Sequence, residues 1–201
     1  MSRGAIIVLS IVAAIILIGL GIVGWGVGVY NKLVSYDENV KQSWGQVENQ
    51  YQRRYDLIPN LVETVKGYAK HEEDVFEKVA EARSSVGKLT VTPEILSNPQ
   101  AFSRFQQAQD ALSSALTRLM AVSENYPNLK ADQNFLSLQS QLEGTENRIA
   151  VERQRFNQSV QSYNTLVRTM PSAVIASFSG FHERPYFAAQ EGASTAPKVQ
   201  F

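Results

Sequence analysis

The chain opens with a long run of apolar residues that contains no charged side chain. Residues 4–31 are uncharged and consist mainly of Ile, Val, Leu, Ala and Gly. Because ~20 apolar residues in a helix span the ~30 Å hydrocarbon core of a bilayer, the run predicts a transmembrane anchor over residues 1–31. Trp25 and Tyr30 lie where interfacial aromatic side chains are common.

A cleaved signal peptide is the competing interpretation of this run. Signal peptides have apolar cores of roughly 7–15 residues followed by a small-residue cleavage site. This run is longer and no such site follows it, so the pattern favours an uncleaved anchor. Gly24 and Gly28 have the spacing that lets two membrane helices approach closely, although glycine is also common in membrane helices for other reasons.

A second pattern begins at Val40, where apolar residues recur mostly at alternating steps of four and three. The positions are 40, 44, 47, 51, 55, 58, 62, 65, 69, 76, 79 and 86. They predict one helix over residues 40–87, about 70 Å long at ~1.5 Å per residue. Proline inside a helix costs ~3 kcal/mol or more. The pattern nevertheless keeps its phase across Pro59, which favours one kinked helix over a new helix capped by Asp56.

Two further amphipathic runs follow. The first is expected to start at Thr92 and Pro93, as cap and first-turn residue, and to end at Tyr126–Pro127. The second follows Asp132 and stops at Pro171. Their apolar positions are 102, 105, 108, 112, 115, 119 and 122, then 135, 138, 142, 149, 156, 160, 163, 167 and 170. The predicted fold is all-α, an N-terminal transmembrane helix followed over residues 32–201 by an elongated antiparallel bundle with one very long helix.

Polar residues interrupt these stripes, and aromatic residues crowd the tail. Glu72, Arg83 and Glu152 occupy otherwise apolar stripes, where they either pair inside the bundle or mark points at which the stripe reaches solvent. Disordered segments are poor in aromatic residues. The tail, residues 172–201, is therefore expected to pack on its own bundle or on a neighbouring chain. Its aromatic residues are Phe178, Phe181, Tyr186, Phe187 and Phe201.

Composition and charge remove several functional classes. Nineteen basic residues balance nineteen acidic ones, which argues against nucleic acid as a ligand because phosphate binding needs a basic surface. The chain has no cysteine, which excludes disulfides and thiolate catalysis. His71 and Glu72 do not extend to a zinc motif, because Val75 stands where the second histidine would be. The glycines of residues 19–24 match a dinucleotide fingerprint in letters only, since no strand precedes them.

Several segments form a recognisable set: residues 30–34, 51–68, 80–83, 129–131, 178–181, 185–187, 191–193 and 196–201. Their most specific part, the signature block, contains Arg53, Arg54, Tyr55, Asp56, Leu57, Ile58, Pro59, Asn60, Leu61 and Val62. Together these segments resemble the LemA family. The resemblance implies a bacterial membrane protein with one N-terminal span, an α-helical domain and no established enzymatic activity. We accordingly expect no catalytic residue, metal or cofactor.

Function is expected to lie in assembly at a membrane. The leading hypothesis is a non-enzymatic scaffold that self-associates and organises or shapes the bacterial membrane, because the first helix looks too long for its own bundle to cover. The candidates for self-association are Gly24, Gly28, Phe178, Phe181, Tyr186, Phe187 and Phe201. The alternative is a membrane-anchored adaptor or sensor that binds a partner protein. An enzyme ranks third, because no triad, phosphate loop or metal cluster is present.

The charges that flank the apolar run give little indication of the side of the membrane on which the bundle lies. Arg3 stands before the apolar run, and Lys32 and Lys41 follow it, so the positive-inside rule comes close to a tie. Related proteins look like signal-anchored molecules. The chain is therefore expected to cross the bacterial inner membrane once, with its bundle on the extracytoplasmic side and the lipid bilayer and further copies of the chain as its partners.

Overall fold

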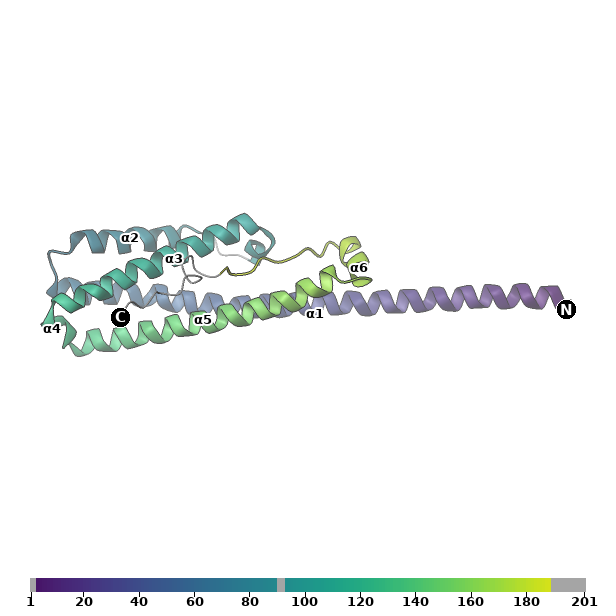
Figure 1. Cartoon of the computed structure of the whole chain (residues 1–201), viewed down its shortest axis with the longest axis horizontal. Helices are drawn as coiled ribbons and strands as arrows, with labels where there is room; N and C mark the ends of the chain where they lie inside the picture. Colours follow the sequence, from purple (N-terminus) through teal and green to yellow (C-terminus); the bar gives the residue numbers. More distant parts are fainter. Residues whose placement is uncertain (1–2, 90–92, 189–201) are drawn as a thin grey trace, which may run out of the picture.

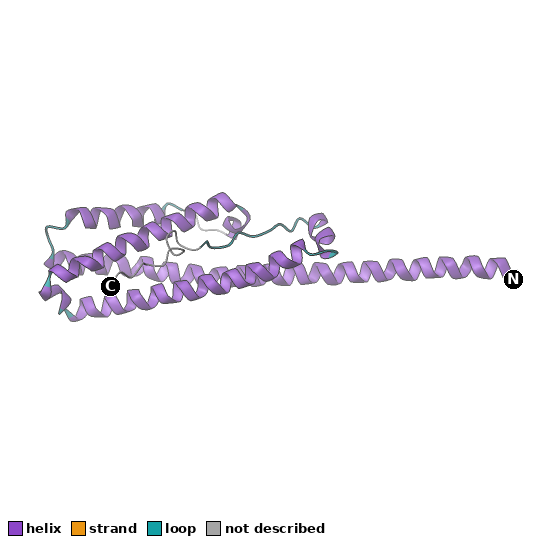
Figure 2. Ribbon diagram, viewed as in Figure 1, coloured by secondary structure: helices purple, strands orange, loops and turns teal. Residues whose placement is uncertain are grey.

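The computed structural model describes residues 3–89 and 93–188. Over these residues it contains six α-helices, two 3₁₀ turns and no strand (Figures 1 and 2). The elements are α1 (Arg3–Tyr68), α2 (Glu73–Gly87), η1 (Pro93–Ser97), α3 (Pro99–Val122), η2 (Ser123–Asn125), α4 (Pro127–Lys130), α5 (Gln133–Arg168) and α6 (Ser172–Phe178). The predicted all-α fold with one very long helix is confirmed.

Helix α1 joins the apolar N-terminal run to the bundle without interruption. Its 66 residues span about 100 Å at ~1.5 Å per residue. The helix continues through Pro59, so the continuity of the predicted kinked helix is confirmed, while the kink itself stays a prediction. The N-terminal part of α1 projects beyond the other helices (Figure 1).

The prediction that this helix continues to Gly87 is wrong. Helix α1 ends at Tyr68, the chain turns over residues 69–72, and α2 runs back beside α1. Phe76 and Val79 of α2 thereby join a core that contains Ile58 and Val65 of α1. Helix α2 folds back and covers part of the apolar stripe of α1. A second chain is therefore not needed to cover that part, contrary to the expectation from the length of the predicted helix.

Helices α1, α2, α3 and α5 form an antiparallel four-helix bundle rather than the predicted three (Figure 1). The most extensive backbone packing pairs α1 with α5 and α2 with α3. One core cluster fills the end of the bundle near α4, where α1, α2, α3 and α5 meet. A second, rich in aromatic rings, fills the middle, and a small third cluster joins Val29 and Leu33 of α1 to Ala176 of α6.

The starts of α3 and α5 follow from their caps. The Asn98 side chain accepts hydrogen bonds from the backbone N–H groups of Gln100 and Ala101, both at 3.1 Å, and Pro99 takes the first helical position. The predicted start of this helix at Pro93 is therefore wrong, and Thr92 lies outside the described residues. Asp132 caps α5 as a side-chain acceptor for the N–H of Phe135 at 2.9 Å.

The C-terminal segment reverses direction after α6 and returns along the bundle. Gly180 adopts a φ of 75°, a conformation that costs glycine little. This lets the N–H of Phe181 reach the carbonyl of Ala176 at 3.0 Å and close the end of α6. Residues 181–188 then lie on the bundle, so the described part of the tail packs on its own chain. Phe201 lies outside the described residues.

Candidate functional site

The N-terminal part of α1 is an exposed apolar rod. Every residue from 7 to 25 is exposed, and α1 is the one helix of the described residues that is long and apolar enough to cross a membrane. Space around Gly24 and Gly28 is open, since nothing lies within 4 Å of a Cβ built at either position. A Cβ on Gly26 would lie 3.6 Å from Cδ1 of Ile175, so α6 packs against α1 at this level.

Further along α1, the buried positions follow a strict alternation of four and three. They are Leu33, Asp37, Val40, Trp44, Val47, Tyr51, Arg54, Ile58, Leu61 and Val65. This spacing keeps one face of α1 against its neighbours over its whole length in the bundle. Two of the ten positions carry charge, and each finds its counter-ion on a distant part of the chain. Asp37 and Arg54 each form a buried network of hydrogen bonds and ion pairs, described next.

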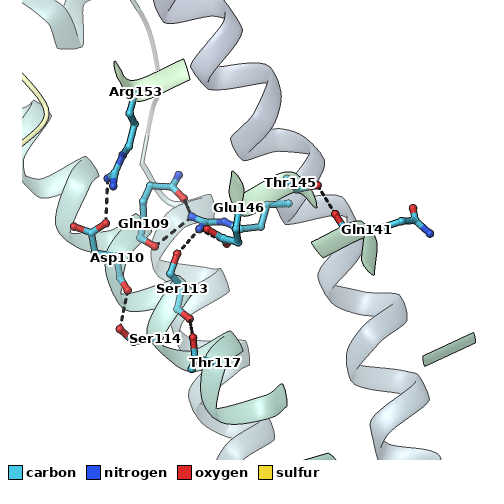
Figure 3. A network of polar contacts seen from close by, with 10 residues as sticks. Gln109, Asp110, Ser113, Ser114, Thr117, Gln141, Thr145, Glu146 and Arg153 are labelled. Carbon is cyan, nitrogen blue, oxygen red and sulfur yellow. Dashed lines mark hydrogen bonds and ion pairs between the residues drawn. The ribbon is translucent and has the colours of Figure 1, made fainter. Parts of the chain in front are cut away.

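Arg54 is only 1% exposed and lies among α1, α3 and α5. Its guanidinium donates hydrogen bonds to the Glu146 carboxylate at 2.7 Å, the Gln109 backbone carbonyl at 3.2 Å, the Gln109 side-chain carbonyl and the Ser113 hydroxyl. Figure 3 shows Glu146 of α5 facing Gln109 and Ser113 of α3. A buried charge is tolerated only when it is paired and hydrogen-bonded, so this network fixes how the three helices fit together.

Asp37 is the counterpart of Arg54 at the anchor end of the bundle. Its carboxylate accepts a hydrogen bond from Nη2 of Arg184 at 2.8 Å and pairs with Nζ of Lys41 at 3.0 Å. Arg184 also donates to the Ser97 hydroxyl. Burial alone would raise the pKa of Asp37. The hydrogen bonds and positive charges of Arg184 and Lys41 outweigh it and lower that pKa below its ordinary value.

Three side-chain amides hold the extended segment that contains Arg184. Asn164 pairs with the backbone N–H and C=O of Arg184, Asn157 with those of Phe187, and Gln106 with those of Ala188, at 2.8–3.1 Å. An amide offers both a donor and an acceptor, so each replaces the partner that a neighbouring strand would supply. The segment is thereby fixed to α3 and α5.

Phe187 inserts its ring into an aromatic cluster at the centre of the bundle. Its centroid lies 4.8 Å from that of Phe102, 5.4 Å from Phe156 and 6.1 Å from Trp44. The Arg153 guanidinium lies 4.6 Å from the Phe187 ring centroid and pairs with Asp110 at 3.0 Å. At the edge of this cluster, burial raises the pKa of the Tyr51 hydroxyl to about 12.

The signature block divides by helix face. Arg54, Ile58 and Leu61 are buried, whereas Arg53, Asp56, Pro59 and Asn60 are exposed; Tyr55, Leu57 and Val62 are intermediate. The sequence stripe through Tyr55 and Val62 was therefore displaced by one residue from the buried positions 54 and 61. Arg54 was missed because a hydrophobic pattern does not register a buried charge. The signal was its place in the four-three alternation that starts at Val40.

The polar residues on the predicted stripes do not pair with one another. Glu72 accepts a hydrogen bond from the Tyr126 hydroxyl at 3.2 Å, and the Arg83 guanidinium lies 4.1 Å from the Tyr55 ring centroid. Glu152 pairs with Arg155 at 2.8 Å on its own helix. Only the contact of Glu152 is local, since Glu72 and Arg83 contact residues of other elements, and none of the three has another of the three as its partner.

The expected self-association residues lie in different environments. Phe187 is 6% exposed and Phe181 is half-buried, with its ring 5.8 Å from that of Tyr30. Both side chains are therefore engaged within the chain. Phe178 is 89% exposed and Tyr186 45% exposed. Gly24 and Gly28 face open space, as described above.

Candidate metal ligands and one groove are described next, because chemistry would require such features. Among the described residues, no group of three or more His, Cys, Asp or Glu side chains could hold a metal ion. His71 is exposed, in the turn between α1 and α2 rather than on a helix as predicted. A groove of about 330 Å³ between α1, α2 and α3 is lined by Tyr51, Tyr55, Phe105 and Gln109 among others. None of these side chains is an ordinary nucleophile with an adjacent base.

The long exposed apolar helix and the four-helix bundle together define a membrane-associated helical protein. The LemA family model matches residues 43–201, so the chain belongs to the LemA family. The matched range begins after residues 30–34, which were part of the resemblance seen in the sequence.

Curated relatives agree with this assignment. Magnetosome protein MamQ of Magnetospirillum gryphiswaldense is 27% identical over 174 residues, which cover 79% of this chain and 64% of the relative. Magnetosome protein MamQ 1 of Paramagnetospirillum magneticum is 26% identical with the same coverage. Protein LemA of Metamycoplasma hominis is 21% identical over 165 residues, which cover 82% of this chain and 71% of the relative. The chain thus spans less than two thirds of the MamQ proteins.

Proposed function

We propose that this protein is a non-enzymatic scaffold that is anchored in the bacterial inner membrane and self-associates there. The observation that carries the proposal is the continuity of α1, which runs as one helix from the exposed apolar rod into the bundle core. A rigid helix transmits the orientation of the anchor to the bundle, as a scaffold requires. The names of the relatives state no reaction, which is compatible with a structural role.

The interior of the bundle supports the non-enzymatic part of the proposal. The buried charges Asp37 and Arg54 both engage partners within the chain. Enzymes instead direct perturbed charged groups into a cleft that a substrate can enter. Here the buried polar groups hold helices and the C-terminal segment together, which is a structural use.

The open glycine face of the anchor supports self-association. Successive residues turn by about 100° around an α-helix, so Gly26 lies nearly opposite Gly24 and Gly28. Since α6 packs against Gly26, the face with Gly24 and Gly28 stays clear of the bundle. Two such faces at the end of the membrane span, with Gly24 inside the apolar rod and Gly28 just beyond it, permit close contact between backbones. We infer that the anchors of two chains pack through this face and so organise the surrounding membrane.

Substitution of both glycines tests this contact. Gly24→Ile with Gly28→Ile should reduce the particle size in mild detergent, because large side chains keep the two backbones apart. The measurement is light scattering coupled to size-exclusion chromatography. Gly19→Ile is the matched control, since residue 19 lies on the other side of the helix and should leave the size unchanged. If the unmodified protein is already a monomer, self-association is wrong and a membrane-anchored adaptor for another protein takes its place.

The bundle is proposed to lie outside the cytoplasm. This orientation would expose α2, α3 and α5 to protease added to intact spheroplasts, while leaving residues 7–25 in the bilayer. The expected result is loss of the bundle on immunoblots, with a cytoplasmic protein intact in the same sample. Full protection in spheroplasts, together with digestion after lysis, would place the bundle in the cytoplasm.

A further inference from the structure

Helix α6 leaves an apolar surface uncovered at the anchor end of the bundle. Phe178 is 89% exposed, more than any other large apolar side chain among the described residues. Met170, just before α6, is 69% exposed, and Val174 is 42% exposed. The opposite face of α6 packs on α1, where Ala176 is buried against Val29 and Leu33. The exposed residues therefore lie on the side of α6 that faces away from α1.

The level of α6 along α1 coincides with the expected edge of the bilayer. Residues 4–25 provide about 22 residues of apolar helix, or ~33 Å, which matches the hydrocarbon thickness. The edge then falls near Trp25, and Ile175 of α6 lies beside α1 at the level of the next residue, Gly26. Figure 1 shows α6 at the end of the bundle from which the anchor emerges. Trp25 and Tyr30 are 44% and 45% exposed at the same level, as interfacial aromatic residues are.

Polar residues begin just beyond this level. Lys32 is exposed on α1, about 9 Å further along the helix than Gly26. Arg168 at the end of α5 is exposed and lies 3.7 Å from the Glu183 carboxylate. An apolar tip bordered by charged side chains has the arrangement of a segment that rests in the headgroup region. Water would otherwise surround three large apolar side chains in this short stretch.

We propose that the turn before α6 and the outer face of α6 insert into the membrane interface, with Met170, Val174 and Phe178 at the boundary between headgroups and acyl chains. The occupant of this surface is the lipid bilayer. The inference rests on the proposed membrane anchor and adds a second contact beside it. With α1 and α6 both in contact with lipid, the end of the bundle is seated on the membrane and cannot tilt freely about α1.

The absence of cysteine from the chain allows a direct test. Single variants Phe178→Cys, Asn128→Cys and Leu17→Cys of the full chain are labelled with an environment-sensitive fluorophore. They are then reconstituted into vesicles of phosphatidylethanolamine and phosphatidylglycerol. Quenching by lipids that carry a spin label at shallow or deep positions reports the depth of each site. Residue 128 lies in α4 at the far end of the bundle, and residue 17 lies within the apolar rod.

The label at residue 178 should be quenched several-fold more than the label at residue 128, and more by shallow than by deep spin labels. The label at residue 17 should respond to deep spin labels. If residue 178 matches residue 128 while residue 17 is quenched, the α6 contact is wrong and the anchor stands. If residue 17 is not quenched, the anchor itself is wrong. If the signal at residue 178 changes only as more protein is added per vesicle, a second copy covers α6, and the lipid assignment fails.

Discussion

Arg54→Ala is expected to lower the free energy of unfolding by about 3–4 kcal/mol. The substitution removes the partner of Glu146, leaves the buried Gln109 side-chain carbonyl without its donor and opens a cavity in the bundle. For a chain of this size the loss corresponds to a fall of about 6–16 °C in melting temperature. Circular dichroism of the full chain in mild detergent measures it.

Arg53→Ala provides a matched control for this experiment. Arg53 is the adjacent residue in the same signature block but is exposed, so its removal should change stability by less than about 0.5 kcal/mol. Arg54→Met retains much of the side-chain volume and should fall between the two, which separates the cavity from the lost hydrogen bonds. Equal, small effects at residues 53 and 54 would contradict the buried position of Arg54.

The overall fold could be predicted from the sequence because its signals are periodic. The uncharged run of residues 4–31 and the repeated spacing of apolar residues specify an anchor followed by helices. The start of α5 was also visible, since an apolar run that begins at Phe135 follows Asp132, and the structure shows that Asp132 caps the helix. These features depend on residues close together in the chain, which is where sequence patterns are informative.

The break between α1 and α2 was not visible for a specific reason. Residues 69–72 contain neither glycine nor proline, and Ala69 and Phe76 are seven positions apart. The four-residue turn reverses the direction of the chain, but the spacing of apolar residues in the sequence still looks like an uninterrupted heptad repeat. The hydrogen bond from the Tyr68 hydroxyl to Asp132, at 3.0 Å, joins this turn to the start of α5, 64 positions away. Such a long-range contact cannot be inferred from local spacing.

The buried charged residues could not be predicted for the same reason, because their partners lie far away in the chain. Asp37 meets Arg184, and Arg54 meets Glu146, over 147 and 92 positions in the chain. The sequence presents each of these residues as one more charge on an amphipathic helix. Only the strict alternation from Val40 through Tyr51 indicates that position 54 belongs to the buried face. The pairing partner itself emerges from the tertiary arrangement.

The aromatic tail was predicted to pack. Its described part does so through hydrogen bonds between side-chain amides of the bundle and the backbone of the tail, which the sequence does not reveal. Asn157 and Asn164 are seven residues apart on α5, so they lie on one face and bind the segment at Phe187 and Arg184. The hydrogen bonds between Asn157 and the backbone of residue 187 position the Phe187 ring in the aromatic cluster. The other rings of this cluster belong to Trp44, Phe102 and Phe156. The C-terminal segment therefore completes the core of the bundle and does more than cover its surface.

Phe187→Ala is accordingly expected to lower the free energy of unfolding by about 3–5 kcal/mol, because it leaves a ring-sized cavity among three aromatic side chains and removes the contact with Arg153. Thermal unfolding of the full chain in mild detergent measures the loss. Phe178→Ala is the control, the same substitution nine residues earlier in the same tail. It should change the melting temperature in detergent much less than Phe187→Ala, since that ring is 89% exposed within the fold. Equal effects of the two substitutions would show that the segment after α6 does not contribute its ring to the core.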